Sequence, residues 1–233
     1  MGGMKLAEVA AVLADGSRAT MCLALIDGRA WTVGELAKAA RIAPSTASEH
    51  IRALTDAGFV RSLKQGRHRY VRLANADVAE LIERLASHAS PEPPRNLRAS
   101  VRARRLAEAR TCYDHLAGRL GVSLRDGMLA EGLIDDRDGL TVTPHGRNTL
   151  AELGVELPRS RRSLLRDCLD WTERREHLAG ALPAALLRRA LDAGWLTRDP
   201  HRAITINHDA WPVLARLGVA RGAQSPALDA AAR

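Results

Sequence analysis

The chain has 233 residues, of which 46% are hydrophobic but only one is Phe, so leucine and alanine must fill most of any core. It carries 35 Lys and Arg against 27 Asp and Glu, and this formal net charge of +8 favours an acidic partner such as nucleic acid. The sequence contains no signal peptide and no run of 18 apolar residues, so we expect a cytoplasmic protein without membrane contact.

The first 90 residues predict short helices followed by a β-hairpin. Apolar periodicity and turn signals place the first helices at 6–13, 17–26 and 32–40. A further helix begins at Pro44 and stops at Gly58. In the stretch RSLKQGRHRYVRLA, polar and apolar residues then alternate on both sides of Gly66, and this pattern predicts a basic β-hairpin. Asp77 is expected to cap one more helix.

The helix that begins at Pro44 has two unlike faces. At about 100° per residue, Ala47, Ile51 and Leu54 fall on one apolar stripe. The opposite face carries mostly short polar side chains and one cation: Ser45, Ser48, Glu49, Arg52 and Asp56. Short polar side chains let a helix backbone approach another surface closely, and DNA offers such a surface.

A proline-rich stretch divides the chain. The segment SPEPPR, residues 90–95, cannot continue a helix because three of its positions are proline. The sequence therefore predicts a domain over 1–90, a linker over 91–97, a second domain over 98–222 and a frayed tail over 223–233.

The second domain contains an internal repeat. HLAG occurs at 115–118 and 177–180, and LGV at 153–155 and 217–219. Between these markers, each copy predicts a helix, a Gly stop, two strands around a polar turn and a second helix. We expect a pair of helix–hairpin–helix repeats that pack as one domain.

Three stretches carry a family resemblance: LADGSRATMCLALIDG, WTVGELAKAARIAPSTASEHIRALTDAGFV and RSLKQGRHRYVRL. Together they resemble the ArsR/SmtB family of bacterial transcriptional repressors over residues 5–90. The implied fold is mainly α with small β-hairpins, a winged helix-turn-helix followed by the C-terminal repeats. The chain departs from the family at Ala43, where a Ser is common. Alanine cannot cap the recognition helix, and Pro44 compensates in part through its fixed φ.

The resemblance implies which residues meet double-stranded DNA. The recognition helix and the wing would contact the operator through Ser45, Thr46, Ser48, Glu49, His50, Arg52, Lys64, Arg67, His68 and Arg69. His50 also lies near the buried flank of its helix, so a packing role stays open.

The resemblance further implies a homodimer that binds a near-palindromic operator. The first and last helices of the module would form the interface through Leu6, Val9, Leu13, Val78, Leu81, Ile82 and Leu85. Two well-known metal sites of the family cannot be carried over. The stretch VGELAKAARI lacks the cysteine pair of one site, and Ala79 stands where the other needs a His.

We expect the effector to bind to the C-terminal domain. Cys112 and His115 lie three residues apart, and we predict that they share a helix. Cys168 and His177 follow in the second repeat. These four could bind a divalent or soft ion such as zinc, cadmium or lead. Alternatively, the cysteines are buried packing residues and the histidines cap or bridge the repeats, which the sequence favours over a metal site, or the thiols sense oxidation.

The sequence leaves further alternatives open. A small organic effector could bind near Trp171 and Trp195, although both tryptophans also fit core positions. Two further functions compete with a repressor: a sequence-indifferent DNA-coating protein, and an enzyme with Cys112 as nucleophile and His115 as base. The sequence shows no phosphate-binding Gly loop and no paired-carboxylate motif.

Overall fold

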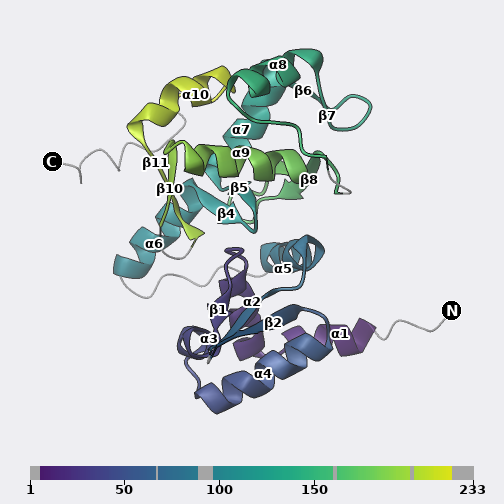
Figure 1. Cartoon of the computed structure of the whole chain (residues 1–233), viewed down its shortest axis with the longest axis vertical. Helices are drawn as coiled ribbons and strands as arrows, with labels where there is room; N and C mark the ends of the chain where they lie inside the picture. Colours follow the sequence, from purple (N-terminus) through teal and green to yellow (C-terminus); the bar gives the residue numbers. More distant parts are fainter. Residues whose placement is uncertain (1–5, 67, 89–96, 160–161, 200–201, 222–233) are drawn as a thin grey trace. The chain divides into compact units, whose positions relative to one another are not determined.

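The structure, a computed structural model, describes residues 6–66, 68–88, 97–159, 162–199 and 202–221 (Figure 1). The chain divides into two compact units, Met1–Ile82 and Glu83–Arg233, and the division falls inside the helix Ala76–His88. The predicted tail and all but the last residue of the predicted linker lie outside the described residues. None of the described helices combines the length and apolar character that a membrane span requires.

The first unit is a winged helix-turn-helix. Its helices α3 and α4 form the helix-turn-helix, and the β2–β3 hairpin forms the wing of an antiparallel sheet with strand order β1-β3-β2. The elements are α1 (Leu6–Leu13), α2 (Gly16–Leu25), β1 (Trp31–Thr32), α3 (Val33–Ala40), α4 (Pro44–Asp56), β2 (Val60–Gln65), β3 (His68–Leu73) and α5 (Ala76–His88).

Capping side chains fix where the two central helices begin. At α3 the Glu35 backbone N–H donates to the Thr32 hydroxyl at 3.3 Å, and the Thr32 backbone N–H donates to the Glu35 carboxylate at 2.7 Å. This reciprocal pair is a capping box. Helix α4 begins without a side-chain cap because Ala43 has none to offer, and Pro44 occupies its first turn, as the sequence predicts.

The cap of α5 differs from the expectation. The Val78 backbone N–H donates to the Asn75 side chain at 2.9 Å, so Asn75 is the capping residue. The prediction that Asp77 caps this helix was wrong because the helix already begins at Ala76. Asp77 instead lies in the first turn, where a negative charge interacts favourably with the helix dipole.

The apolar stripe of α4 is buried as predicted. Ala47, Ile51 and Leu54 have no exposed surface, and α4 packs against α2, α3 and β2. Because this stripe occupies one side of the helix, the polar side chains at the intervening positions are turned away from the core.

The second unit alternates short hairpins with helices. After α6, the order hairpin, helix, hairpin, helix occurs twice along the chain. The elements are α6 (Leu97–Glu108), β4 (Arg110–Cys112), β5 (His115–Ala117), α7 (Arg119–Ala130), β6 (Ile134–Asp135), β7 (Thr141–Val142), α8 (Pro144–Glu152), β8 (Arg166–Leu169), β9 (Glu176–Ala179), α9 (Ala181–Asp192), β10 (Leu196–Arg198), β11 (Ile204–Ile206), η2 (His208–Ala210) and α10 (Trp211–Arg216).

The stretch RTCYDHLAG is a hairpin. Cys112 and His115 face each other across β4 and β5, and Tyr113 in the turn has a φ of 56°. The prediction that they share a helix was therefore wrong. A spacing of three fits either one helical turn or a two-residue hairpin turn, and strands this short show no periodicity that would decide between them.

Aliphatic side chains fill the core of the second unit. The largest buried cluster is dominated by leucines from α7, α8, α9 and α10, and Trp195 packs at its edge. Close backbone contact holds α8 against this core, because a Cβ added at Gly146 would lie 1.9 Å from the Leu133 carbonyl oxygen.

Gly146→Ala should lower the free energy of unfolding of the second unit by about 1–3 kcal/mol, because the backbone of Leu133 must move to admit the methyl group. Urea unfolding followed by tryptophan fluorescence measures this change. Asn148→Ala, at an exposed position of the same helix, is the control and should stay within about 0.5 kcal/mol of wild type. Equal stability of the two variants would contradict the close packing of α8.

Candidate functional site

Helix α4 presents a short polar face to solvent. Ser45, Ser48, Glu49 and Arg52 are exposed, and Thr46 is half-buried beside them. The Ser48 hydroxyl donates to the Pro44 carbonyl at 2.9 Å, which leaves its oxygen free to accept a hydrogen bond. This face offers hydroxyl, carboxylate and guanidinium groups within a few turns, the groups that read base edges and phosphates.

The wing adds cations beside this helix face. Lys64 and Arg69 are exposed and lie opposite each other in the β2–β3 register, and Arg69 donates to the Ser62 hydroxyl at 3.0 Å. Arg67 lies outside the described residues, and so does the side chain of His68. Gly66 has a φ of 58°, a left-handed conformation that the tight turn requires and glycine adopts without strain.

His50 lies on the buried flank of α4. Its side chain is 18% exposed, and Nδ1 is 3.4 Å from the Arg18 guanidinium and 3.9 Å from the Asp15 carboxylate. These contacts join α4 to the start of α2. They favour the packing role for His50 that the sequence left open.

Helices α1 and α5 expose apolar side chains. Val9 is 43% exposed, Leu81 41% and Leu85 50%, whereas Ile82 is buried at 4%. Leu13 and Val78 are half-buried, and the side chain of Leu6 lies outside the described residues. Exposed apolar side chains such as these are typical of a protein–protein interface when they gather on one surface.

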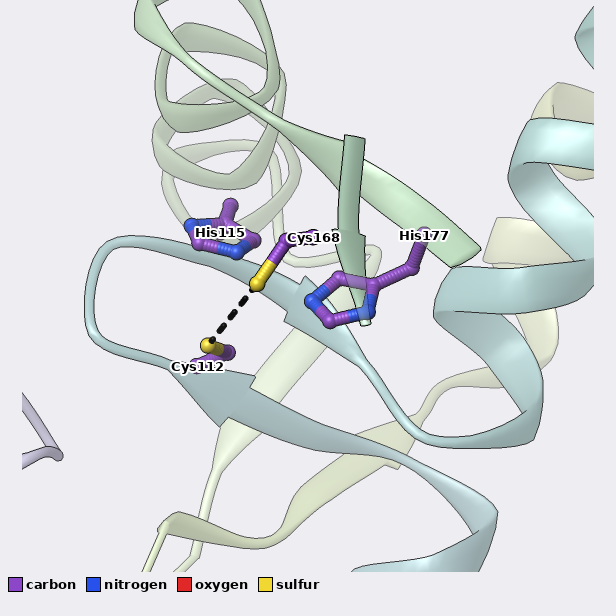
Figure 2. A group of neighbouring side chains, drawn as sticks. All are labelled: Cys112, His115, Cys168 and His177. Atoms are coloured by element: carbon purple, nitrogen blue, oxygen red, sulfur yellow. Dashed lines mark hydrogen bonds between the residues drawn. The ribbon is translucent and has the colours of Figure 1, made fainter. Parts of the chain in front are cut away.

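The second unit gathers Cys112, His115, Cys168 and His177 into one buried cluster (Figure 2). Each hairpin contributes a cross-strand pair, Cys112 opposite His115 and Cys168 opposite His177, and β5 lies beside β9. One ligand atom from each residue lies within 4.8 Å of all the others. None of the four residues is more than 3% exposed. Figure 2 shows the two imidazole rings on either side of the Cys168 sulfur.

The two thiols of the cluster have opposite acidities. A hydrogen bond with Cys112, helped by His115 and His177, holds the pKa of Cys168 well below its usual range. The same hydrogen bond and burial raise the pKa of Cys112. Burial lowers the pKa of His115, but its contacts with Asp114 and Cys168 outweigh burial and raise it.

Each histidine of the cluster has an aspartate beside its Nδ1 atom. His115 Nδ1 is 3.3 Å from Asp114, and His177 Nδ1 is 3.7 Å from Asp170. Both aspartates stand two residues after the cysteine of their own hairpin. We did not identify either aspartate from the sequence, although aligning RTCYD with RDCLD would have revealed the shared Cys-x-Asp pattern.

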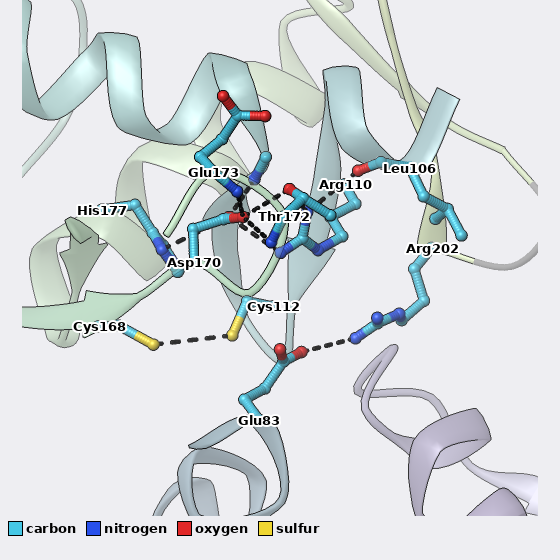
Figure 3. Close-up of polar contacts among 11 residues, drawn as sticks. Glu83, Leu106, Arg110, Cys112, Cys168, Asp170, Thr172, Glu173, His177 and Arg202 are labelled. Atoms are coloured by element: carbon cyan, nitrogen blue, oxygen red, sulfur yellow. Dashed lines mark hydrogen bonds and ion pairs between the residues drawn. The ribbon is translucent and has the colours of Figure 1, made fainter. Parts of the chain in front are cut away.

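Asp170 also anchors a buried polar network (Figure 3). Arg110 and Asp170 are both fully buried, and the guanidinium donates to the carboxylate at 2.9 Å. Arg110 lies 4.8 Å over the ring of Trp171, and Asp170 accepts further hydrogen bonds from the Gly118 backbone and the Thr172 hydroxyl. Burial raises the pKa of Asp170, but Arg110 and these donors hold it well below its usual range.

The two tryptophans that could line a site for an organic effector have different surroundings. Trp171 is covered by Arg110, whereas Trp195 lines a small, entirely apolar pocket with Leu116, Leu186 and Leu214. This pocket offers no polar group that could orient a ligand. Cys22 is buried in the first unit, where burial raises its pKa to about 12, so it is a packing residue with little reactivity.

Comparisons with known proteins agree with the architecture of the first unit. A family model described as a helix-turn-helix domain matches residues 13–62. The chain is 42% identical over 206 residues to the HTH-type transcriptional regulator YdfF of Bacillus subtilis (strain 168), an alignment that covers 86% of this chain and 91% of YdfF. An alignment of this length extends through both units.

Several solved structures are similar to part of the chain. Reduced HlyU from Vibrio cholerae N16961 is 26% identical and covers 35% of this chain and 84% of its own, with a TM-score of 0.32. The homodimeric winged helix-turn-helix domain of Mb0332 from Mycobacterium bovis is 27% identical, and the match covers 41% of this chain and 100% of that domain, with a TM-score of 0.33. The repressor BigR from Xylella fastidiosa is 24% identical, and the match covers 38% of this chain and 89% of BigR, with a TM-score of 0.35.

Proposed function

Because this chain belongs to the family of HTH-type transcriptional regulators, and its first unit resembles the ArsR/SmtB repressors in sequence, we propose that it is a repressor that binds a near-palindromic operator as a homodimer. The second unit then carries the response to an effector. The observation that carries the proposal is the division of α4 into a buried apolar stripe and an exposed short polar face.

In this proposal α4 enters the major groove. Its buried stripe fixes the helix to α2, α3 and β2, so the opposite face is held rigidly toward the DNA. Arg52 makes a bidentate contact to a base, Glu49 accepts from a cytosine amine, and the hydroxyls of Ser45, Thr46 and Ser48 bond to phosphates or bases. The wing cations Lys64 and Arg69 contact the DNA backbone, and His50 packs against α2.

The exposed apolar residues of α1 and α5 support the proposed homodimer. Val9, Leu81 and Leu85 lose their contact with water when the same surface of a second copy covers them. A twofold dimer of this kind presents two α4 helices to successive major grooves, which matches a near-palindromic operator.

Arg52→Ala should weaken operator binding by about 1–3 kcal/mol and blur the preference at one base pair, because a bidentate base contact is lost. Lys64→Ala should instead weaken binding to all sequences alike and reduce the slope of log K against log salt by about one unit, since one phosphate contact is lost. Titrations of operator and scrambled DNA at several salt concentrations measure both effects. Equal and salt-independent losses in the two variants would contradict these roles.

A sequence-indifferent DNA-coating protein is the competing function for the same positive charge. A repressor should prefer its operator to unrelated DNA by about 10³ or more, whereas a coating protein shows almost no preference. The ratio of the two affinities at one salt concentration decides between these functions.

A further inference from the structure

The cluster of Cys112, His115, Cys168 and His177 contains buried polar atoms that the protein leaves unpaired. His115 Nε2 and both ring nitrogens of His177 have no hydrogen-bond partner among the described residues. Asp170 is 3.7 Å from His177 Nδ1, too far for a normal hydrogen bond. Buried polar atoms are nearly always paired in folded proteins, so the unpaired Nε2 atoms of the two histidines indicate a missing partner within the cluster.

The spacing of the cluster fits one tetrahedral ion. Two thiolates at ~2.3 Å from such an ion lie about 3.8 Å apart, and the two sulfurs here are 4.0 Å apart. Two imidazoles bound through nitrogen at ~2.0 Å place their ring centroids about 5 Å apart, and the observed separation is 5.1 Å. Small movements of the side chains would bring all four ligand atoms onto one ion.

The surroundings of both histidines match those of metal ligands. A metal-binding imidazole usually has a carboxylate at its other nitrogen, which fixes the tautomer and the ring orientation. Asp114 and Asp170 occupy this position for His115 and His177. Asp114 is itself held by Arg162, and Asp170 by Arg110. Both Nδ1 atoms therefore face a carboxylate, which leaves both Nε2 atoms for the ion.

We propose that Cys112, His115, Cys168 and His177 bind one Zn²⁺ in a closed tetrahedral site that joins the two halves of the second unit. Two thiolates and two imidazoles in a tetrahedral arrangement select zinc among the common cellular ions. All four ligands come from the protein and all are buried, so the ion has no open position for a substrate. Its role is to hold the β4–β5 and β8–β9 hairpins together, and this role does not depend on the DNA binding proposed above.

Neither a disulfide nor simple packing of the cysteines satisfies the two imidazoles. A disulfide between Cys112 and Cys168 requires the sulfurs to approach from 4.0 Å to ~2.05 Å and pairs neither histidine. Packing of the cysteines with Ala117 and Ala179 accounts for their burial but also leaves the ring nitrogens without partners. A bound ion supplies a partner to both rings and to both sulfurs at once.

The direct test is metal binding by the full chain. Protein stripped by a chelator and kept reduced and anaerobic is titrated with Co²⁺, a spectroscopic substitute for zinc, and the Co²⁺ is then displaced with Zn²⁺. We expect one ion per chain, the visible absorption bands of tetrahedral cobalt with thiolate charge transfer, and a Kd for zinc in the nanomolar range or below. Octahedral cobalt spectra, or no binding at micromolar zinc, would overturn the proposal.

Variants locate the ion. Cys112→Ser/Cys168→Ser should abolish the thiolate charge transfer and lose the ion, whereas Cys22→Ser, which removes the buried thiol of the first unit, should bind one ion as wild type does. Asp114→Asn keeps all four ligands but replaces the carboxylate beside His115 with a neutral amide, so we expect zinc affinity to fall about 10–100-fold in a chelator competition. Undiminished binding by the double variant places the ion elsewhere and overturns the site. An unchanged affinity in Asp114→Asn would contradict the ligand role of His115.

Discussion

Arg110→Met should lower the free energy of unfolding of the second unit by about 3–5 kcal/mol, because it leaves the Asp170 carboxylate buried without its counter-ion. Methionine approximates the length of the arginine side chain, so the main loss is the charge and its hydrogen bonds. The contact between the guanidinium and Trp171 is lost as well. Urea unfolding followed by tryptophan fluorescence reports on this unit, since three of the four tryptophans belong to it.

Two further variants show whether burial is the cause. Arg110→Met/Asp170→Asn removes both charges and should recover part of the lost stability, because no unpaired charge remains buried. Arg137→Met removes a surface arginine that pairs with Asp135 and is 84% exposed, and this change should destabilise the unit far less than Arg110→Met. If Arg110→Met is no less stable than Arg137→Met, the buried pair does not stabilise the unit.

Leu85→Glu should convert the proposed dimer into monomers and lower operator affinity about 100-fold or more. In the dimer two copies of the new carboxylate would be buried without partners, which is costly. A monomer also loses the gain from binding two half-sites at once, which is typically 10²–10⁴-fold. Because Leu85 is 50% exposed in the single chain, the glutamate should not disturb the fold itself.

Sedimentation velocity and operator titration measure the two consequences of Leu85→Glu together. Leu97→Glu makes the same change at a leucine of α6 that is 77% exposed, and it should remain dimeric with unchanged affinity. A Leu85→Glu protein that stays dimeric would show that the interface lies away from α5.

Local signals were sufficient to predict much of the first unit. The buried stripe of α4, the uncapped start at Ala43 and the hairpin around Gly66 each depend on residues close together in the chain. Such features follow from side-chain periodicity, capping chemistry and turn conformation, which act over a few residues. The cap at Asn75 was missed because Asn75 and Asp77 are both residue types that can cap a helix, and the periodic pattern does not decide that the helix begins at Ala76.

The sequence by itself determined that Cys112, His115, Cys168 and His177 are candidates to meet, since the repeated HLAG places both histidines at corresponding positions. It could not determine how they meet. The strands that carry them are three or four residues long, too short for a periodic pattern, so Cys112 and His115 were expected on one helix. Only the tertiary structure brought β5 beside β9 and placed Asp114 and Asp170 at the two imidazoles. The contacts between the two hairpins join residues more than fifty positions apart, and packing of the whole unit, rather than local preference, brings such residues together.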